Sequence, residues 1–276
     1  MPTAEDQEIS ILRVERERVT FTLISTTPLI YHRVGQKAQR ELLLPRAGRK
    51  TPAEKAASFK HYPLIEYRDS VYRCKADLNQ DTRLVFPAEA FHQAMSDAAL
   101  DLPGLKKAQI GRLCGVDVLD VSIYGVPQLF MTVVRNSDQN HTPDIRTRAV
   151  LPKWGCQVSI WFAKPLLRRT SIIDLMASAG IYIGIGDYRQ QKGAGSFGLW
   201  DVVDSNDAEF KKLQKNCGRE AQDRALENPA FFDDQTRDLF EWCTEEMARR
   251  TEQRPIKVGK RSKQTIEDEE VLDAAE

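Results

Sequence analysis

Residues 181–200, IYIGIGDYRQQKGAGSFGLW, decide how the rest of the chain is interpreted. The stretch begins with an apolar run at residues 181–185, and residues 197–203 return to a composition suited to a strand. Glycine at this density is typical of a loop in which the backbone bends or approaches another group closely. We therefore expect a strand, a loop and a further strand, with the loop glycines at Gly184, Gly186, Gly193, Gly195 and Gly198.

The glycine-rich loop lacks the known nucleotide-binding patterns. A P-loop requires Gly-x-x-x-x-Gly-Lys-Ser/Thr, whereas Lys192 precedes Gly193 in this chain. A dinucleotide-binding loop requires a third glycine and a following helix, but the sequence after Gly186 leads towards another strand. Two interpretations remain open: a turn that needs glycine only for its geometry, or a loop whose amides, Arg189 and Lys192 lie against phosphates.

The N-terminal part of the chain predicts a strand followed by a long basic insertion. Residues 19–25 (VTFTLIS) alternate between polar and apolar side chains, which predicts a first strand. Residues 26–60 lose this pattern and hold eight Lys and Arg against two acidic residues, Glu41 and Glu54. Connections of this length without their own periodicity are usually functional or disordered. We expect the insertion to carry part of any binding site.

Further elements follow from spacing along the chain. Residues 64–74 predict two short strands around Arg68-Asp69-Ser70. Residues 88–100 have apolar side chains at helical spacing and predict a helix. Residues 171–179 predict a second, short helix that ends at Gly180.

Four segments in the middle of the chain have the composition of strands. Residues 116–123 and 129–134 are rich in β-branched side chains and are separated by Gly125-Val126-Pro127, which predicts a hairpin. Residues 146–150 and 156–162 alternate between polar and apolar side chains, which predicts two more strands.

The charge of the chain is balanced overall but unevenly distributed. The 40 Lys and Arg equal the 40 Asp and Glu. Residues 1–200 hold 27 basic against 20 acidic side chains, whereas residues 201–276 hold 13 against 20. A basic body favours an anionic partner, although a difference of this size also occurs in proteins that bind nothing charged.

Membrane insertion and secretion have no support in the sequence. The apolar run at residues 116–131 is interrupted by Asp117, Asp120 and Pro127. Residues 1–8 are acidic and polar and lack the basic and apolar regions of a signal peptide. We therefore expect a cytoplasmic protein without a membrane partner.

Catalytic and metal-binding patterns are also missing. The five cysteines contain no Cys-x-x-Cys pair, and the four histidines are dispersed. No Gly-x-Ser-x-Gly is present. We predict no catalytic residues, no metal and no cofactor. One alternative remains open, in which His32, with Tyr31 and Lys37, cleaves RNA without a metal by general acid–base catalysis.

Basic side chains are interleaved with aromatic ones in three loops. Lysine and arginine neutralise phosphates, while aromatic rings stack on unpaired bases, so this composition favours single-stranded nucleic acid over duplex. For any single residue, a packed or solvated role is the better explanation. The predicted nucleic-acid-binding residues are Arg33, Lys37, Arg40, Arg49, Lys50, Arg146, Arg148, Lys153, Trp154, Tyr188, Arg189 and Lys192.

The order of these pieces resembles the RAMP superfamily of CRISPR-associated proteins, in particular its Cas7-like backbone subunits. Residues 22–30 (TLISTTPLI) resemble the family's first strand and Thr/Ser-Pro-Leu turn. Residues 85–95 (VFPAEAFHQAM) resemble its Ile-Pro-x-x-x-Leu element at the start of a helix, and residues 181–200 resemble its glycine-rich loop. The chain is also similar to bacteriophage and prophage proteins that carry the same Gly-Ile-Gly-Asp-Tyr/Trp-Arg loop.

The resemblance implies a ferredoxin-like core, single-stranded RNA bound along a basic face, and head-to-tail assembly into filaments. In cleaving members of the family, an aspartate in the loop after the first strand performs the cut. Residues 26–50 contain no aspartate, so the resemblance favours binding over catalysis. It also implies expression in a host cytoplasm if the protein is encoded by a phage.

These observations predict an α+β protein with a ferredoxin-like (RRM-like) core, a mostly antiparallel sheet, insertions and C-terminal helices. We expect an N-terminal extension at 1–16, the Cas7-like domain at 17–203, a helical segment at 204–250 and a disordered charged tail at 251–276. Helices are expected at 210–225 and 238–250.

The expected function is non-catalytic binding of single-stranded RNA or DNA, with RNA favoured, by a protein that self-associates as an oligomer or filament. The alternative is a protein-interaction module that engages a host complex or a phage particle through residues 204–276.

Overall fold

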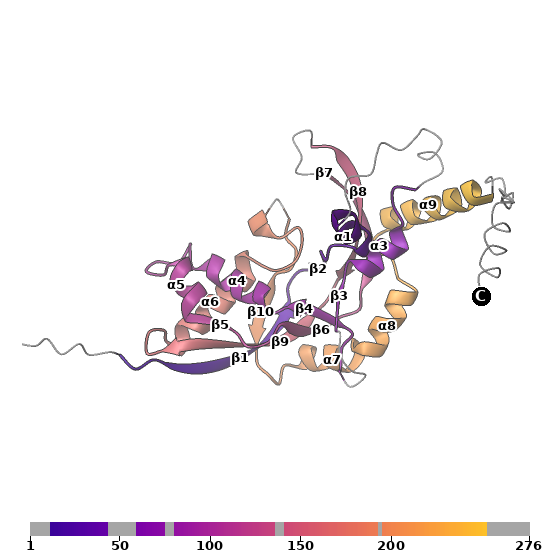
Figure 1. The fold of residues 1–276 in the computed structure, drawn as a ribbon. Helices are drawn as coiled ribbons and strands as arrows, with labels where there is room; N and C mark the ends of the chain where they lie inside the picture. Colours follow the sequence, from indigo (N-terminus) through magenta and orange to yellow (C-terminus); the bar gives the residue numbers. More distant parts are fainter. Residues whose placement is uncertain (1–11, 44–58, 75–79, 136–140, 193–194, 253–276) are drawn as a thin grey trace, which may run out of the picture.

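The computed structural model describes residues 12–43, 59–74, 80–135, 141–192 and 195–252 (Figure 1). Within them the chain forms an α+β structure with a seven-stranded sheet and a separate three-stranded sheet. The paired strands of both sheets run antiparallel. The α+β class with a mostly antiparallel sheet and C-terminal helices is therefore confirmed.

The larger sheet contains a ferredoxin-like core. Its central strands lie in the order β10-β1-β9-β6. The chain reaches β6 through α4 and reaches β10 through α6, and these two helices pack against each other on one face of the sheet. The core elements are β1 (Glu15–Ser25), α4 (Glu89–Ala98), β6 (Asp120–Tyr124), β9 (Gly155–Lys164), α6 (Arg169–Tyr182) and β10 (Trp200–Val203).

The longest strand pair in this core joins β1 to β9. Their register runs from Glu15 opposite Lys164 to Ile24 opposite Gly155. The alternation that predicted β1 places Val19, Phe21 and Leu23 on the helix-covered face, where all three are buried. Burying side chains of this size contributes about 1.5–3 kcal/mol each, so the alternating pattern is a main source of stability for the core.

The remaining elements of the larger sheet flank this core. The sheet continues from β6 to β4 (Leu84–Pro87) and β3 (Tyr72–Arg73), while β5 (Cys114–Val116) pairs with β9. α5 (Lys107–Leu113) lies between α4 and β5 along the chain. The predicted strand pair within 64–74 is wrong in its first half, because α3 (Pro63–Asp69) is a helix with proline at its first turn.

The smaller sheet consists of β2 (Leu29–Ile30), β8 (Pro143–Leu151) and β7 (Gln128–Arg135). The predicted hairpin between residues 116–123 and 129–134 is wrong, because β7 pairs with β8 in this second sheet. Both edges of β6 are already occupied by β4 and β9. Gly125, with φ +157°, donates its amide to the Cys217 carbonyl and directs the chain out of the larger sheet.

The predicted strand at residues 181–185 is also wrong. α6 continues through Gly180 to Tyr182, and the glycine-rich loop therefore joins a helix to β10. The reason lies in Trp200: a Cβ on Gly180 would lie 2.2 Å from the Trp200 carbonyl oxygen. Gly180 thus permits α6 to contact the backbone of β10, and it does not end the helix.

The C-terminal segment forms three helices, α7 (Ala208–Asn216), α8 (Arg219–Glu227) and α9 (Asp234–Glu252). The single helix expected at 210–225 is interrupted at Cys217-Gly218. α7 packs Phe210 and Leu213 against Ile24 and Tyr124, whereas α9 packs against β7. Most of the tail predicted at 251–276 lies outside the described residues.

No helix within the described ranges combines the length and the apolar character needed to cross a membrane.

Candidate nucleic-acid interface

The glycine-rich loop is fixed against β2 by backbone hydrogen bonds. Gly198 donates to the Pro28 carbonyl at 2.7 Å, and Asp187 donates to the Ile30 carbonyl at 3.0 Å. Gly186 and Gly198 have φ values of +87° and +76°. A Cβ on Gly186 would lie 2.6 Å from the Ile30 oxygen. The glycines therefore supply both a left-handed backbone and a close approach, and they place the residues that follow at a defined position.

Tyr188 has an unusual backbone conformation within this loop. Its φ is +56°, a region that bulky residues rarely adopt, and such strain is concentrated at functional sites. The residue is 48% exposed, and its ring meets that of Phe197 edge-on at 6.4 Å between centroids. The strained turn therefore presents an accessible aromatic ring.

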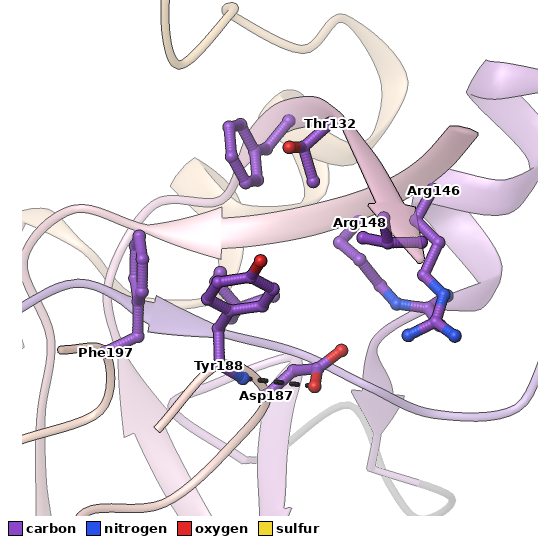
Figure 2. Close-up of a pocket in the computed structure, with 9 residues that line it drawn as sticks. Thr132, Arg146, Arg148, Asp187, Tyr188 and Phe197 are labelled. Atoms are coloured by element: carbon purple, nitrogen blue, oxygen red, sulfur yellow. Dashed lines mark hydrogen bonds between the residues drawn. The ribbon is translucent and has the colours of Figure 1, made fainter. Parts of the chain in front are cut away.

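Tyr188 borders a cavity of about 100 Å³ beneath the β7–β8 ribbon (Figure 2). Cross-strand pairs on this ribbon place Phe130 opposite Arg148 and Thr132 opposite Arg146. Because alternate residues of a strand share a face, these side chains all line the cavity. The loop contributes Asp187, whose Oδ1 accepts a hydrogen bond from the Tyr188 amide at 3.1 Å. The cavity thus combines aromatic rings, two guanidinium groups and one carboxylate.

Arg148 connects this cavity to the next part of the surface. Burial lowers the pKa of Arg148, and the Asp187 carboxylate opposes that shift. Its Nε is buried without a hydrogen-bond partner among the described residues. Tyr72 also interacts electrostatically with Arg148 and Arg33. Arg148 therefore lies near Tyr72 as well as beside the cavity that Tyr188 borders. A buried donor without a partner is costly in a folded protein and indicates a place for an acceptor from a ligand.

A second cavity, of about 470 Å³, is lined by Arg33, Arg68, Tyr72 and Arg73 together with Asp69. Burial lowers the pKa of Arg73, and the charges of nearby arginines lower it further, while Asp69 opposes the shift. Arg68 is held by the carbonyls of Leu226 and Glu227 at the end of α8, at 2.8 and 2.9 Å. Arg33 and Arg73 therefore bring positive charge to the cavity next to an aromatic ring.

A third cavity, of about 530 Å³, lies between these two, under α1 (Gln36–Leu43) and α3. It shares Arg146 and Arg148 with the first cavity and Asp69 with the second. Its wall includes His61, whose ring nitrogens lie 3.0 Å from Glu66 Oε1 and 3.0 Å from Asp144 Oδ1. The three cavities form one arginine–tyrosine surface, which we define by Arg33, Tyr72, Arg73, Arg146, Arg148 and Tyr188.

The structure brings four of the predicted residues together on this surface, namely Arg33, Arg146, Arg148 and Tyr188. Lys37 and Arg40 lie in α1, which borders the third cavity, and Arg40 is exposed. Lys192 lies in the short 3-10 helix η1 (Gln190–Lys192), and Arg189 is half-buried just before it. Arg49, Lys50 and Gly193 are outside the described residues.

Two predicted residues do not belong to the surface. Trp154 is fully buried, and its Nε1 donates to the Thr27 carbonyl at 3.0 Å, so it is a core side chain and not a stacking platform for bases. Lys153 lies beyond the end of β8, where its Nζ is 3.4 Å from Glu209 on α7. Trp154 lies just before β9 and continues the alternation that buries Cys156 and Val158 of that strand. A buried tryptophan usually has a hydrogen-bond partner for its N–H, as Trp154 does.

Sequence reasoning missed Arg68, Tyr72, Arg73 and Asp187. The first three lie in residues 68–73 (RDSVYR), which have the same interleaving of basic and aromatic side chains as the predicted clusters. The assignment of 64–74 to strands concealed this signal, because α3 and β3 turn these side chains towards Arg33. No sequence pattern identifies Asp187 as part of the cavity.

The cysteines and His32 are the other side chains that could carry reactive chemistry. Burial raises the pKa of the Cys114 thiol to about 12 and raises that of Cys156 as well. The His32 ring packs near Tyr72 and Phe86, at 5.9 and 5.8 Å between centroids. Among the described residues, no cluster of three or more His, Cys, Asp or Glu could hold a metal ion.

Asp97 anchors the far side of the glycine-rich loop. This α4 residue is 4% exposed and forms an ion pair with Lys107 of α5. Burial by itself raises the pKa of Asp97, but hydrogen bonds from Lys107, Gln191 and Gln93 outweigh burial and hold the pKa below its ordinary value. Because Gln191 belongs to η1, the Asp97 carboxylate connects α4 and α5 to the glycine-rich loop.

We expect Asp97→Asn to lower the free energy of unfolding at pH 7 by about 1–2 kcal/mol, since the charged hydrogen bonds are lost while Lys107 remains partly solvated. A carboxylate with a lowered folded-state pKa stabilises the protein above its unfolded pKa, near 4, and this contribution is lost as the pH falls below that value. Urea unfolding of both proteins at pH 7 and pH 3 measures the effect. An equal difference at both pH values would contradict this role.

Comparison of the chain with protein-family models gave no match, and comparison with curated protein sequences gave none either.

Proposed function

We propose that this protein binds single-stranded nucleic acid, with RNA favoured over DNA, without cleaving it. The observation that carries the proposal is the position of Arg146 and Arg148 between two cavities that each contain an accessible tyrosine, Tyr188 and Tyr72. Guanidinium groups bind phosphates, and rings spaced along the same surface stack on unpaired bases. A duplex keeps its bases stacked inside, so this arrangement suits a single strand.

The proposal includes assembly into a Cas7-like filament and a phage origin. The strand order β10-β1-β9-β6, with helices after β1 and β9, supports the family resemblance. In support of the same assignment, the glycine-rich loop lies directly beside the arginine–tyrosine surface. Head-to-tail assembly would align the surfaces of successive copies along one strand of RNA.

The test is fluorescence anisotropy of labelled 20-nucleotide single-stranded RNA and DNA with the purified protein at two salt concentrations. Light scattering after size-exclusion chromatography on the same samples reports assembly. Salt-dependent binding with growth in mass is the expected result, because released counterions make phosphate contacts sensitive to salt. Absence of binding to either oligonucleotide at low salt would refute the proposal.

A protein-interaction module is the second candidate, and one observation favours it. Trp242 on α9 is 64% exposed beside an apolar cavity of about 210 Å³ that Phe59, Met131 and Leu239 also line. Exposed aromatic side chains at apolar cavities are typical of protein interfaces. For this candidate, the anisotropy experiment would show no salt-dependent binding of nucleic acid.

The endoribonuclease alternative involves His32. This candidate would convert labelled RNA into shorter products in the presence of EDTA, and His32→Ala would abolish the conversion.

A further inference from the structure

The carboxylate of Asp187 is unexpected on a surface that binds phosphates. A negative charge beside Arg146 and Arg148 weakens their attraction for any phosphate. The structure nevertheless holds Asp187 firmly, because its amide donates to the Ile30 carbonyl and Gly186 allows the close approach. A carboxylate is purely an acceptor with about four lone-pair sites, and the Tyr188 amide uses one of them. The remaining sites can accept hydrogen bonds from a ligand.

The groups around Asp187 indicate which other features a ligand that donates to this carboxylate would have. Figure 2 shows the Asp187 carboxylate between the Tyr188 ring and the side chains of Arg146 and Arg148. Electrostatic interaction between Asp187 and Arg148 confirms their proximity. The buried Arg148 Nε has no partner among the described residues and can donate to an acceptor of a ligand. A ligand that uses both groups presents donors and acceptors side by side, and a planar one can also stack on the exposed Tyr188 ring.

Guanine meets these requirements better than the other bases. Its Watson–Crick edge carries two neighbouring donors, N1–H and the 2-amino group, which match the two oxygens of a carboxylate. Its other edge carries the acceptors O6 and N7, the preferred bidentate partners of arginine. Cytosine offers a carboxylate only its 4-amino group, adenine offers only its 6-amino group, and uracil offers a single N–H.

We propose that the cavity bordered by Phe130, Arg146, Arg148, Asp187 and Tyr188 accepts one unpaired guanine, stacked on Tyr188 and read by Asp187 and Arg148, while Arg146 contacts the adjoining phosphate. This inference rests on the proposed binding of single-stranded nucleic acid and deepens it, because it assigns a base preference to one position of the strand. Contacts elsewhere on the surface are to the backbone and leave the sequence free.

The test compares 12-nucleotide oligouridine RNAs that carry one central guanine, adenine or cytosine, with anisotropy as the measurement. We expect the guanine RNA to bind roughly tenfold more tightly than the others, in line with the discrimination of a bidentate contact. Inosine lacks the 2-amino group, and 7-deazaguanine lacks N7. Each should reduce the preference several-fold in the unchanged protein, which avoids any effect of a mutation on folding.

Asp187→Asn removes the second acceptor and should reduce the preference to about twofold or less. The matched control is Asp174→Asn on α6, an exposed residue that loses the same charge outside the cavity and should keep the preference. Thermal unfolding checks that both variants are folded.

The outcomes separate the two proposals. Equal, salt-dependent binding of all the RNAs would overturn the guanine inference and leave nucleic-acid binding intact. A preference for cytosine, or a guanine preference that survives Asp187→Asn and inosine, would also overturn it. Absence of binding by every RNA would overturn both proposals.

Discussion

Replacing Gly198 with alanine is expected to lower the free energy of unfolding by about 3 kcal/mol or more. The residue has a φ of +76°, and a Cβ there would lie 1.8 Å from the Ile185 carbonyl oxygen. An alanine pays for the left-handed conformation and also displaces backbone atoms that cannot rotate away. The displaced loop segment carries the hydrogen bonds from Gly198 to Pro28 and from Ile185 to Gly198. The substitution therefore weakens the hydrogen bonds that hold the glycine-rich loop against β2.

Urea unfolding measures this effect, with Ser196→Ala as the control. Ser196 is an exposed residue of the same loop and should tolerate alanine within about 0.5 kcal/mol. A Gly198→Ala protein as stable as the control would show that the loop can relax without loss of packing.

Replacing both Arg146 and Arg148 with alanine is expected to weaken binding of single-stranded RNA by about 100-fold. Each charged hydrogen bond contributes about 1.5–3 kcal/mol, and the losses are not fully additive because the two side chains line the same cavities. Loss of the Arg146 phosphate contact should also reduce the slope of log affinity against log salt by about 0.7. The salt slope distinguishes a lost phosphate contact from a general loss of folded protein.

The measurement is an anisotropy titration at four salt concentrations. The matched control is Lys211→Ala with Lys215→Ala, which removes two positive charges from the exposed side of α7. We expect the control to keep the salt slope of the unchanged protein. An unchanged slope in the arginine variant would exclude Arg146 from contact with the phosphate backbone.

The positions of the residues on the arginine–tyrosine surface were only partly predictable from the sequence. Arg33, Arg146, Arg148 and Tyr188 were identified because basic and aromatic side chains alternate locally in their loops. Trp154 satisfied the same rule, but its side chain is in the core. Composition reports which chemical groups are available, whereas burial depends on the face that the folded chain presents to solvent.

Arg68, Tyr72 and Arg73 were missed because residues 64–74 predict two strands, whereas the first half of this segment belongs to the helix α3. The residues of α3 and β3 come next to Arg33 because the Arg33 amide donates to the Ser70 carbonyl between them, and because β3 pairs with β4 at the edge of the larger sheet. Asp187 lines the cavity because the backbone of Gly186 closely approaches that of Ile30, and no sequence pattern indicates this approach.

The sequence by itself determined the α+β class, the strands β1, β8 and β9, and the helix α4. Their side chains repeat with a period of two or of 3.6, and a period is a local property that backbone geometry converts directly into a buried face. Only the tertiary structure decided that β7 pairs with β8 in a second sheet and not with β6, and that α6 continues through Gly180. Those outcomes depend on which strand edges are already occupied and on how closely Trp200 approaches, distances between residues far apart in the chain. The arginine–tyrosine surface has the same origin, because it exists only where β8, α3 and the glycine-rich loop meet.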